Sequence, residues 1–212
     1  MRYAIIRDKR LGGTFDAGLR NNDQTNIFTA YANTPIRNIH DAIASEIDDA
    51  LPNRTLFILC HGFAGSSQTR QQSADVGGGG LQLGAENVLH SNVASWSRIA
   101  GYFRNIIVYA CAASNTEEGT MGTDRDGRYL MGALAIHTRA DVYAADRIQY
   151  YQRRGFNFGG WEGQLLHFGP NGRDPQPVNR PPLEFSEIPR RPQNQAAARR
   201  MTTGGGRIHP RR

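Results

Sequence analysis

Apolar and polar positions alternate in blocks along the first 170 residues, and the blocks predict strands and helices in turn. Three uninterrupted apolar runs, at 56–60, 106–110 and 142–145, are typical of strands buried on both faces. Two shorter runs, at 3–6 and 27–31, predict further strands.

Three segments between these strands have apolar residues at three- and four-residue spacing, which is typical of amphipathic helices. They are 36–51, 85–103 and 126–138. Strands that alternate with helices predict an α/β fold with a mostly parallel sheet and helices on both faces, a three-layer sandwich. A terminal hairpin is expected at 156–168, with its turn near Gly159 and Gly160.

Residues 171–212 differ in composition from the rest of the chain. Eight of the ten prolines fall at 170 or later. Residues 171–212 have nine arginines and three acidic residues, whereas residues 1–170 have sixteen basic and sixteen acidic residues. We therefore predict one domain, 1–170, and a disordered basic tail, 171–212. One exception is that Leu183, Phe185 and Ile188 are close enough in sequence to dock as a short arm.

The charge distribution limits the partners. A neutral body argues against nucleic-acid binding by the domain itself, and leaves nucleic acid as a partner for the basic tail alone. No apolar run approaches the roughly 18 residues that a membrane helix needs. The four-residue apolar stretch near the start is too short for a signal-peptide core. We expect no membrane partner, and a cytoplasmic protein or one secreted without a recognisable signal.

The two longest apolar runs end in residues that can carry chemistry. His61 and Gly62 follow one run, and Cys111 follows the next. A helix-sized crossover between the runs makes them neighbours in the sheet, so imidazole and thiol meet at the same edge. The imidazole can take the thiol proton and generate a thiolate nucleophile, and the N–H groups of Gly62 and Cys111 can hold an oxyanion. Cys60 is expected to point to the opposite face, into the core.

This arrangement resembles the caspase-like (clan CD) cysteine peptidases, in which one apolar strand ends in His-Gly and a second in a small residue and Cys. The separation of His61 and Cys111, about 50 residues, is similar to that in caspases. Segments 81–84 and 140–142 resemble parts of bacterial caspase-like domains without an assigned function. The resemblance covers about 1–168. It implies a caspase-like fold, a bacterial source and a catalytic pair of His61 and Cys111.

The resemblance also implies a function. It predicts a thiol protease, a hydrolase that cuts protein or peptide substrates through an acyl-enzyme and needs no metal or other cofactor. Asp141 and Asp146 flank the third buried strand, where related enzymes shape the pocket for the residue before the cut. Carboxylates there would suit an Arg or Lys side chain, so both are candidate substrate-binding residues.

Two alternatives stay open. The domain could bind or scaffold without cleaving, as a non-catalytic caspase-like module. Residues 61–66 (HGFAGS) also resemble the oxyanion loop of lipases, which would favour an α/β-hydrolase-type esterase. That alternative needs a G-x-S-x-G nucleophile elbow, and the sequence has none.

Overall fold

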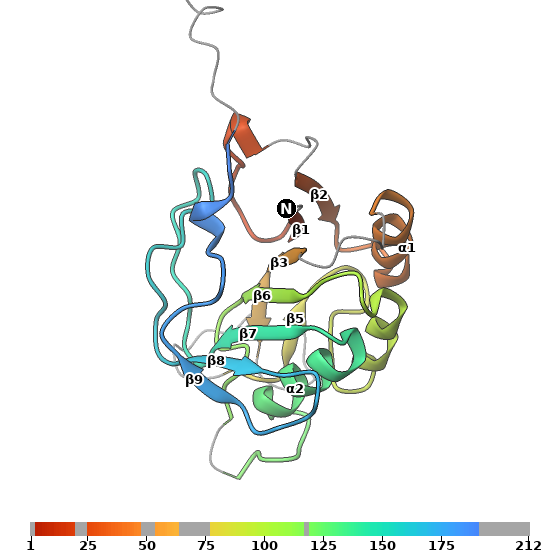
Figure 1. Cartoon of the computed structure of the whole chain (residues 1–212), viewed down its shortest axis with the longest axis vertical. Helices are drawn as coiled ribbons and strands as arrows, with labels where there is room; N and C mark the ends of the chain where they lie inside the picture. The colour runs from red at the N-terminus through yellow and green to blue at the C-terminus, as the bar shows by residue number, and fades with distance from the viewer. Residues whose placement is uncertain (1–2, 20–24, 48–53, 64–76, 117–118, 191–212) are drawn as a thin grey trace, which may run out of the picture.

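The centre of the protein is a seven-stranded sheet in the order β2-β1-β3-β6-β7-β8-β9 (Figure 1). The computed structural model describes residues 3–19, 25–47, 54–63, 77–116 and 119–190. The strands are β1 (Tyr3–Asp8), β2 (Thr25–Ala30), β3 (Thr55–Leu59), β6 (Asn105–Tyr109), β7 (Asp141–Ala145), β8 (Leu165–Phe168) and β9 (Gln176–Val178). The first five are parallel, and β8 and β9 are antiparallel to their neighbours. The predicted α/β class and mostly parallel sheet are confirmed.

Strands β3 and β6 lie at the middle of the sheet and are buried on both faces, as their apolar runs predict. Successive side chains point to opposite faces. Leu56, Ile58 and Ile106 therefore join one hydrophobic cluster, while Phe57 and Ile107 join the other.

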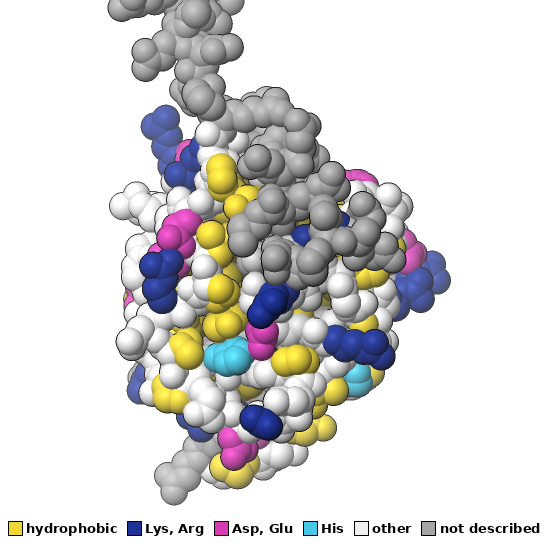
Figure 2. Space-filling view, in the orientation of Figure 1, with side chains coloured by type: hydrophobic (Ala, Val, Ile, Leu, Met, Phe, Trp, Pro, Cys, Tyr) yellow, Lys and Arg dark blue, Asp and Glu magenta, His cyan; other side chains and the backbone are white. Residues whose placement is uncertain are grey.

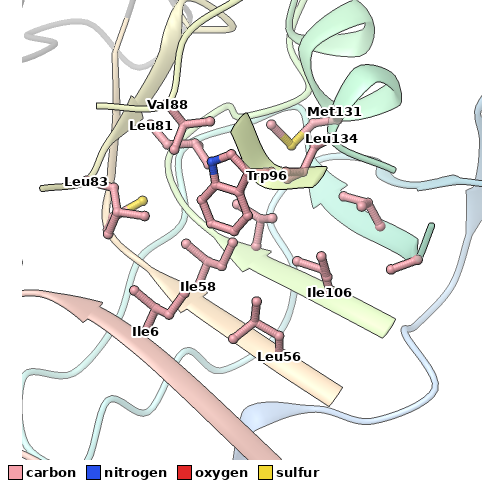
Figure 3. Close-up of a cluster of buried hydrophobic side chains, with 14 of the residues drawn as sticks. Ile6, Leu56, Ile58, Leu81, Leu83, Val88, Trp96, Ile106, Met131 and Leu134 are labelled. Atoms are coloured by element: carbon pink, nitrogen blue, oxygen red, sulfur yellow. The ribbon is translucent and has the colours of Figure 1, made fainter. Parts of the chain in front are cut away.

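Helices cover one face of the sheet. They are α1 (Ile36–Glu46), α2 (Gly127–Thr138) and the 3-10 helix η2 (Val93–Ile99). Trp96 of η2 is fully buried between side chains of the central strands and those of α2 (Figure 3). This cluster is the larger of the two cores, and it holds the helices against the sheet through apolar burial.

Loops cover the opposite face, which corrects the predicted three-layer sandwich with helices on both faces. The only helical turns described there are the short 3-10 helices η1 (Ala17–Leu19) and η3 (Phe185–Glu187). In Figure 1 the α-helices lie on one side of the sheet, and the segment before β8 and the blue C-terminal segment lie on the other. Aromatic residues of these irregular segments, among them Phe156 and Phe158, fill the second core instead of a helix face.

Two predicted helices are shorter than expected. Helix α1 ends at Glu46, and the rest of the predicted segment, from 48 to 51, lies outside the described residues. Of the segment 85–103 only η2 is helical. Asn92 explains this, because its side chain accepts from the Leu89 N–H and donates to the Asn87 carbonyl, which holds the chain in a turn.

The C-terminal part of the sheet also differs from the prediction. In the expected hairpin 156–168, only β8 is a strand, and its partners are β7 and β9. Residues 171–190 are not a disordered tail, because β9 extends the sheet and Phe185 and Ile188 are buried in the second core. The docked arm is therefore the correct alternative for this stretch. The remainder of the predicted tail, 191–212, lies outside the described residues.

Two surface properties bear on partners. Within the part of the chain that the structure describes, no helix is long and apolar enough to cross a membrane. On the face drawn in Figure 2, basic and acidic side chains are scattered among uncharged ones and form no continuous basic stripe.

His40 on α1 makes the stability of this fold depend on pH. Its ring lies edge-on to Trp96, with the ring centroids 5.0 Å apart, and neither ring nitrogen has a hydrogen-bond partner among the described residues. Burial, helped by the positive charge of Arg98, lowers the pKa of His40 from 6.5 to about 4. Below pH 6.5 the unfolded chain takes up a proton that the folded protein rejects, so stability falls as the pH drops from 6.5 towards 4.

We expect the wild type to lose about 2 kcal/mol more unfolding free energy between pH 7.5 and pH 5 than the variant His40→Leu. Leucine keeps the helix and the apolar contact with Trp96 but has no proton to bind. Urea unfolding of both proteins at the two pH values measures the difference. Equal losses in the two proteins would show that the folded state accepts a proton on His40.

Phe185 tests whether the C-terminal arm belongs to the fold. Its ring is 1% exposed and meets Phe57 edge-on at 5.5 Å between centroids. We expect Phe185→Ala to lower the unfolding free energy by about 3–5 kcal/mol, because it empties a filled site in the second core. The exposed neighbour Ser186 is the control. Ser186→Ala should stay within about 0.5 kcal/mol of the wild type. If both variants behave alike in urea unfolding, the arm contributes nothing to stability.

Candidate active site

The register of the two central strands brings His61 and Cys111 together. Leu59 of β3 lies opposite Tyr109 of β6, and His61 and Cys111 each follow two residues later. Both residues line one pocket of about 620 Å³ at the carboxyl edge of the sheet. Side chains two residues apart in a strand point to the same face. His61 and Cys111 therefore lie on the same face as Leu59 and Tyr109, which is the face that loops cover.

Gly62 lets the two strand ends touch. After Cys60 the chain continues into β4 (His61–Phe63), which pairs with β5 (Gly80–Gln82) in a separate two-stranded ribbon. A Cβ atom at Gly62 would collide with the carbonyl group of Cys111. The bare side of this glycine therefore packs against the backbone of the candidate nucleophile.

His61 is oriented by a backbone carbonyl. Its Nε2 lies 3.3 Å from the carbonyl oxygen of Arg10, in the loop that follows β1. With the proton on Nε2 this contact is an N–H···O hydrogen bond, and Nδ1 is then the basic nitrogen of the ring. A ring held in this tautomer is suited to accept a proton from a neighbouring thiol.

Cys111 lies at a tight turn. It is a free, partly exposed thiol, and the next residue, Ala112, has a left-handed backbone with φ of 46°. The N–H of Ala112 donates to the Arg147 carbonyl at 2.8 Å, which ties the turn to the loop after β7. No acceptor among the described residues takes the N–H of Cys111. That N–H is therefore a candidate donor to an oxyanion formed beside the sulfur.

The run of glycines before β5 packs against this turn. A Cβ at Gly77 would collide with Ala112, and one at Gly78 would collide with the carbonyl of Asn115. Gly78 also has a φ of +85°, which favours glycine. The run thus serves close backbone packing behind Cys111.

Cys60 is chemically unlike Cys111. It is 1% exposed, lies in the helix-side core as predicted, and forms no disulfide. Burial raises the pKa of the Cys60 thiol well above its usual value, and the charge of Asp8 adds to the effect. At neutral pH Cys60 is a protonated core residue.

A fixed arginine stands at one side of the pocket. The Asp8 carboxylate is fully buried and accepts from Arg10 through Nε at 2.8 Å and Nη2 at 2.7 Å. It also accepts from the backbone N–H groups of Arg10 and Gly84. The hydrogen bond to Asp8 raises the pKa of Arg10 further above its already high value. Arg10 therefore presents a permanent positive charge in one orientation.

Aromatic side chains from the loop after β7 and from β6 form the pocket floor. Tyr109 packs on Phe158 with 4.2 Å between ring centroids, and both rings line the pocket. The Tyr109 hydroxyl accepts the N–H of Phe185 at 3.2 Å, so the C-terminal arm supports the floor from behind. Burial raises the pKa of Tyr109, which keeps this hydroxyl protonated.

The two aspartates predicted to bind substrate do not line the pocket. Asp141 begins β7 and lies at the opposite edge of the sheet, roughly 13 Å from the end of the strand at about 3.3 Å per residue. Its carboxylate meets Nε2 of His167 at 2.8 Å. Asp146 is at the correct edge, but its carboxylate accepts the N–H of Gln164 at 2.8 Å and holds the loop before β8.

Sequence reasoning missed the arginines. Asp8 is the last residue of β1 and Arg10 follows it closely, so a search of every strand end would have found both. Arg153 also lines the pocket, but it is carried by an irregular loop and nothing in its sequence context indicates this. Within the described ranges, no three His, Cys, Asp or Glu side chains gather in a group that could hold a metal ion.

No protein-family model matches the chain, and comparisons with curated proteins and with solved structures found no match.

Gly62→Ala tests the close contact between the two strand ends. We expect it to lower the unfolding free energy by about 1–3 kcal/mol, because a methyl group must displace the Cys111 backbone. Gly160→Ala is the matched control, since that exposed glycine has open space around its Cα. The control should change stability by less than about 0.5 kcal/mol in urea unfolding. Equal stability of the two variants would contradict the contact.

Proposed function

We propose that the protein is a cysteine endopeptidase that cuts peptide bonds through an acyl-enzyme on Cys111. The observation that carries this proposal is that His61 and Cys111, from the ends of adjacent parallel strands, line the same pocket. The pocket volume of about 620 Å³ is in the range of pockets that bind small ligands or side chains.

The first half of the reaction forms the acyl-enzyme. Nδ1 of His61 takes the proton from the Cys111 thiol, and the thiolate attacks the scissile carbonyl carbon. The carbonyl oxygen becomes an oxyanion near the N–H of Cys111, with the N–H of Gly62 as a second candidate donor. As the C–N bond breaks, His61 returns its proton to the amine, which leaves.

The second half releases the product. A water molecule enters in place of the amine and gives a proton to His61 as its oxygen attacks the thioester. The resulting tetrahedral intermediate collapses, the acid product leaves, and the proton returns to the sulfur. The Arg10 carbonyl stabilises the imidazolium that forms in each half of the reaction, because it accepts a hydrogen bond from the Nε2–H group throughout.

The two thiols allow a sharp test with a mixed peptide library. We expect the wild type to cut peptides, Cys111→Ala to lose all turnover, and Cys60→Ala to retain it. His61→Gln should lower turnover about 10²- to 10⁴-fold, since the amide cannot carry the proton. Mass spectrometry identifies the products. Equal cleavage by the wild type and Cys111→Ala would refute the proposal.

Alkylation of the native protein with iodoacetamide is an independent readout. Cys111 should react at least about ten times faster than Cys60, because only Cys111 is accessible and Cys60 holds its proton. Peptide mapping after brief labelling gives the two rates. If the library is not cut and both thiols react equally slowly, the non-catalytic binding module replaces the peptidase.

A further inference from the structure

We propose that a groove between α2 and the loop joining β8 to β9 binds an extended segment of a partner protein. In this segment an apolar residue has an acidic residue two positions away on each side. The groove lies on the helix-covered face of the sheet, whereas His61 and Cys111 lie on the loop-covered face. The proposal therefore does not depend on the proposed peptidase function.

The groove follows one side of α2 and has a volume of about 420 Å³. Helix α2 contributes three adjacent pairs, four residues apart, which are Arg128 and Tyr129, Gly132 and Ala133, and Ile136 and His137. The facing side is formed by Phe168 and by residues 172–175, whose loop runs in blue beside α2 in Figure 1. At 1.5 Å of rise per residue, the groove extends about 13 Å along the helix from its first to its last α2 residue.

The apolar sides of the groove are open to solvent. The structure describes five large apolar side chains that are exposed, and two of them, Tyr129 at 59% and Ile136 at 47%, line this groove. The Tyr129 ring stacks on His90 at 5.3 Å between centroids, so its position is fixed. Exposed apolar surface of this kind marks a binding site. Sides this open do not enclose a small ligand, so the occupant is a chain segment that continues past both ends.

Gly132 keeps the middle of the groove hollow. Glycine destabilises the interior of a helix relative to alanine. Packing does not require it here, because a Cβ atom would meet only Phe168 among the described residues, at an ordinary contact distance of 3.9 Å. The missing side chain instead leaves a recess between Tyr129 and Ile136. We infer that this recess takes an apolar side chain of the partner.

Basic side chains lie at both ends of the groove. Arg128 begins it, and His137 ends it on the same helix. A Cβ atom at Gly172 would lie 3.4 Å from Ile136, which places the next residue, Arg173, towards the His137 end. No described residue forms an ion pair or a side-chain hydrogen bond with any of these three basic side chains. Their donors are therefore available to acidic groups of a partner.

The carboxylates of the groove do not cancel this charge. Asp126 is 5% exposed and accepts from the Thr116 hydroxyl at 2.6 Å and the Gly122 N–H at 2.7 Å. It also accepts the Tyr129 N–H at 3.1 Å, which caps α2. Among the described lining residues, Asp174 is then the one carboxylate left to face two arginines and a histidine. Charge complementarity favours an acidic partner.

The spacing of these groups selects an extended segment. Side chains two residues apart in an extended chain point the same way and are about 6.6 Å apart. Arg128 and His137 each lie about 7 Å along the axis from the middle of the groove. An apolar residue placed over Gly132 thus brings the residues two positions before and after it to the basic ends. In a helical segment, residues two apart do not face the same side.

The experiment uses the full chain with Cys111→Ala, which cannot cut a bound probe through Cys111. The probe is a fluorescein-labelled peptide amide, Gly-Glu-Ser-Leu-Ser-Glu-Gly, and its control is Gly-Ser-Glu-Leu-Glu-Ser-Gly, which has the same composition and charge. We expect the probe to bind at least about 10-fold more tightly, because only its acidic residues share the side of the leucine. Fluorescence anisotropy gives both affinities. Equal binding, or no binding of either peptide, overturns the proposal.

Two variants assign the binding to the groove. Gly132→Leu should weaken the probe at least about 10-fold by filling the recess, without lowering the urea midpoint, because leucine is a good helix former. Arg128→Gln should weaken it about 3- to 10-fold. Arg125→Gln is the matched control, since Arg125 is exposed and outside the lining, and should bind the probe normally. Undiminished binding by Gly132→Leu, or equal losses in the two arginine variants, would contradict the groove as the site.

Two further measurements exclude other occupants. Sedimentation should give the same oligomeric state for the wild type and Gly132→Leu. A dimer that this variant dissociates would make a second copy of the chain the occupant and overturn the proposal. An oligothymidylate should not displace the probe. Displacement that is lost in Arg128→Gln would assign the groove to nucleic acid instead.

Discussion

The parallel pairing of β3 with β6 is the constraint on which the site depends. Opposed Leu59 and Tyr109 fix the register, and two residues later His61 and Cys111 meet at the same edge and on the same face. A slip of one residue would turn one of them into the opposite core. Both strands are apolar on both faces, so such a slip would cost little on hydrophobic grounds alone. The close contact of Gly62 with the Cys111 carbonyl adds a steric reason for this register.

The end of β1 adds charge to the same edge. Asp8 would be costly to bury alone, and it is tolerated because Arg10 and the Gly84 N–H satisfy it. The pair therefore does two things at once. It attaches the loop after β1 to the segment after β5, and it fixes the guanidinium of Arg10, which lines the same pocket as His61. The carbonyl of Arg10 also orients the imidazole. Stability and site geometry are thus coupled through one residue, Arg10.

The sequence predicted the features that depend on local pattern, and it failed where tertiary contacts decide. The buried runs at 56–60 and 106–110 gave correct strands, and the placement of His61, Cys111 and Cys60 followed from strand ends and alternation. The length of the helix predicted at 85–103 was wrong because Asn92 bonds to the backbone. Arg153 could not be placed, since its position depends on backbone bonds between two loops far apart in sequence. Composition alone also could not show that Phe185 is buried.

Loops rather than helices cover the face that carries the site, and this has a physical reason. Between its ends a helix uses its backbone N–H and C=O groups internally, so its flank presents only side chains to a pocket. The loops after β1 and β7 present a carbonyl to His61, two arginines and the Phe158 ring of the floor within one pocket. Such loops need support to keep one shape. Phe185 of the C-terminal arm provides it, because its ring meets that of Phe158 edge-on at 5.8 Å between centroids and its N–H donates to Tyr109 beneath the same loop. A segment with the composition of a tail is therefore part of the framework that holds the floor beneath Cys111.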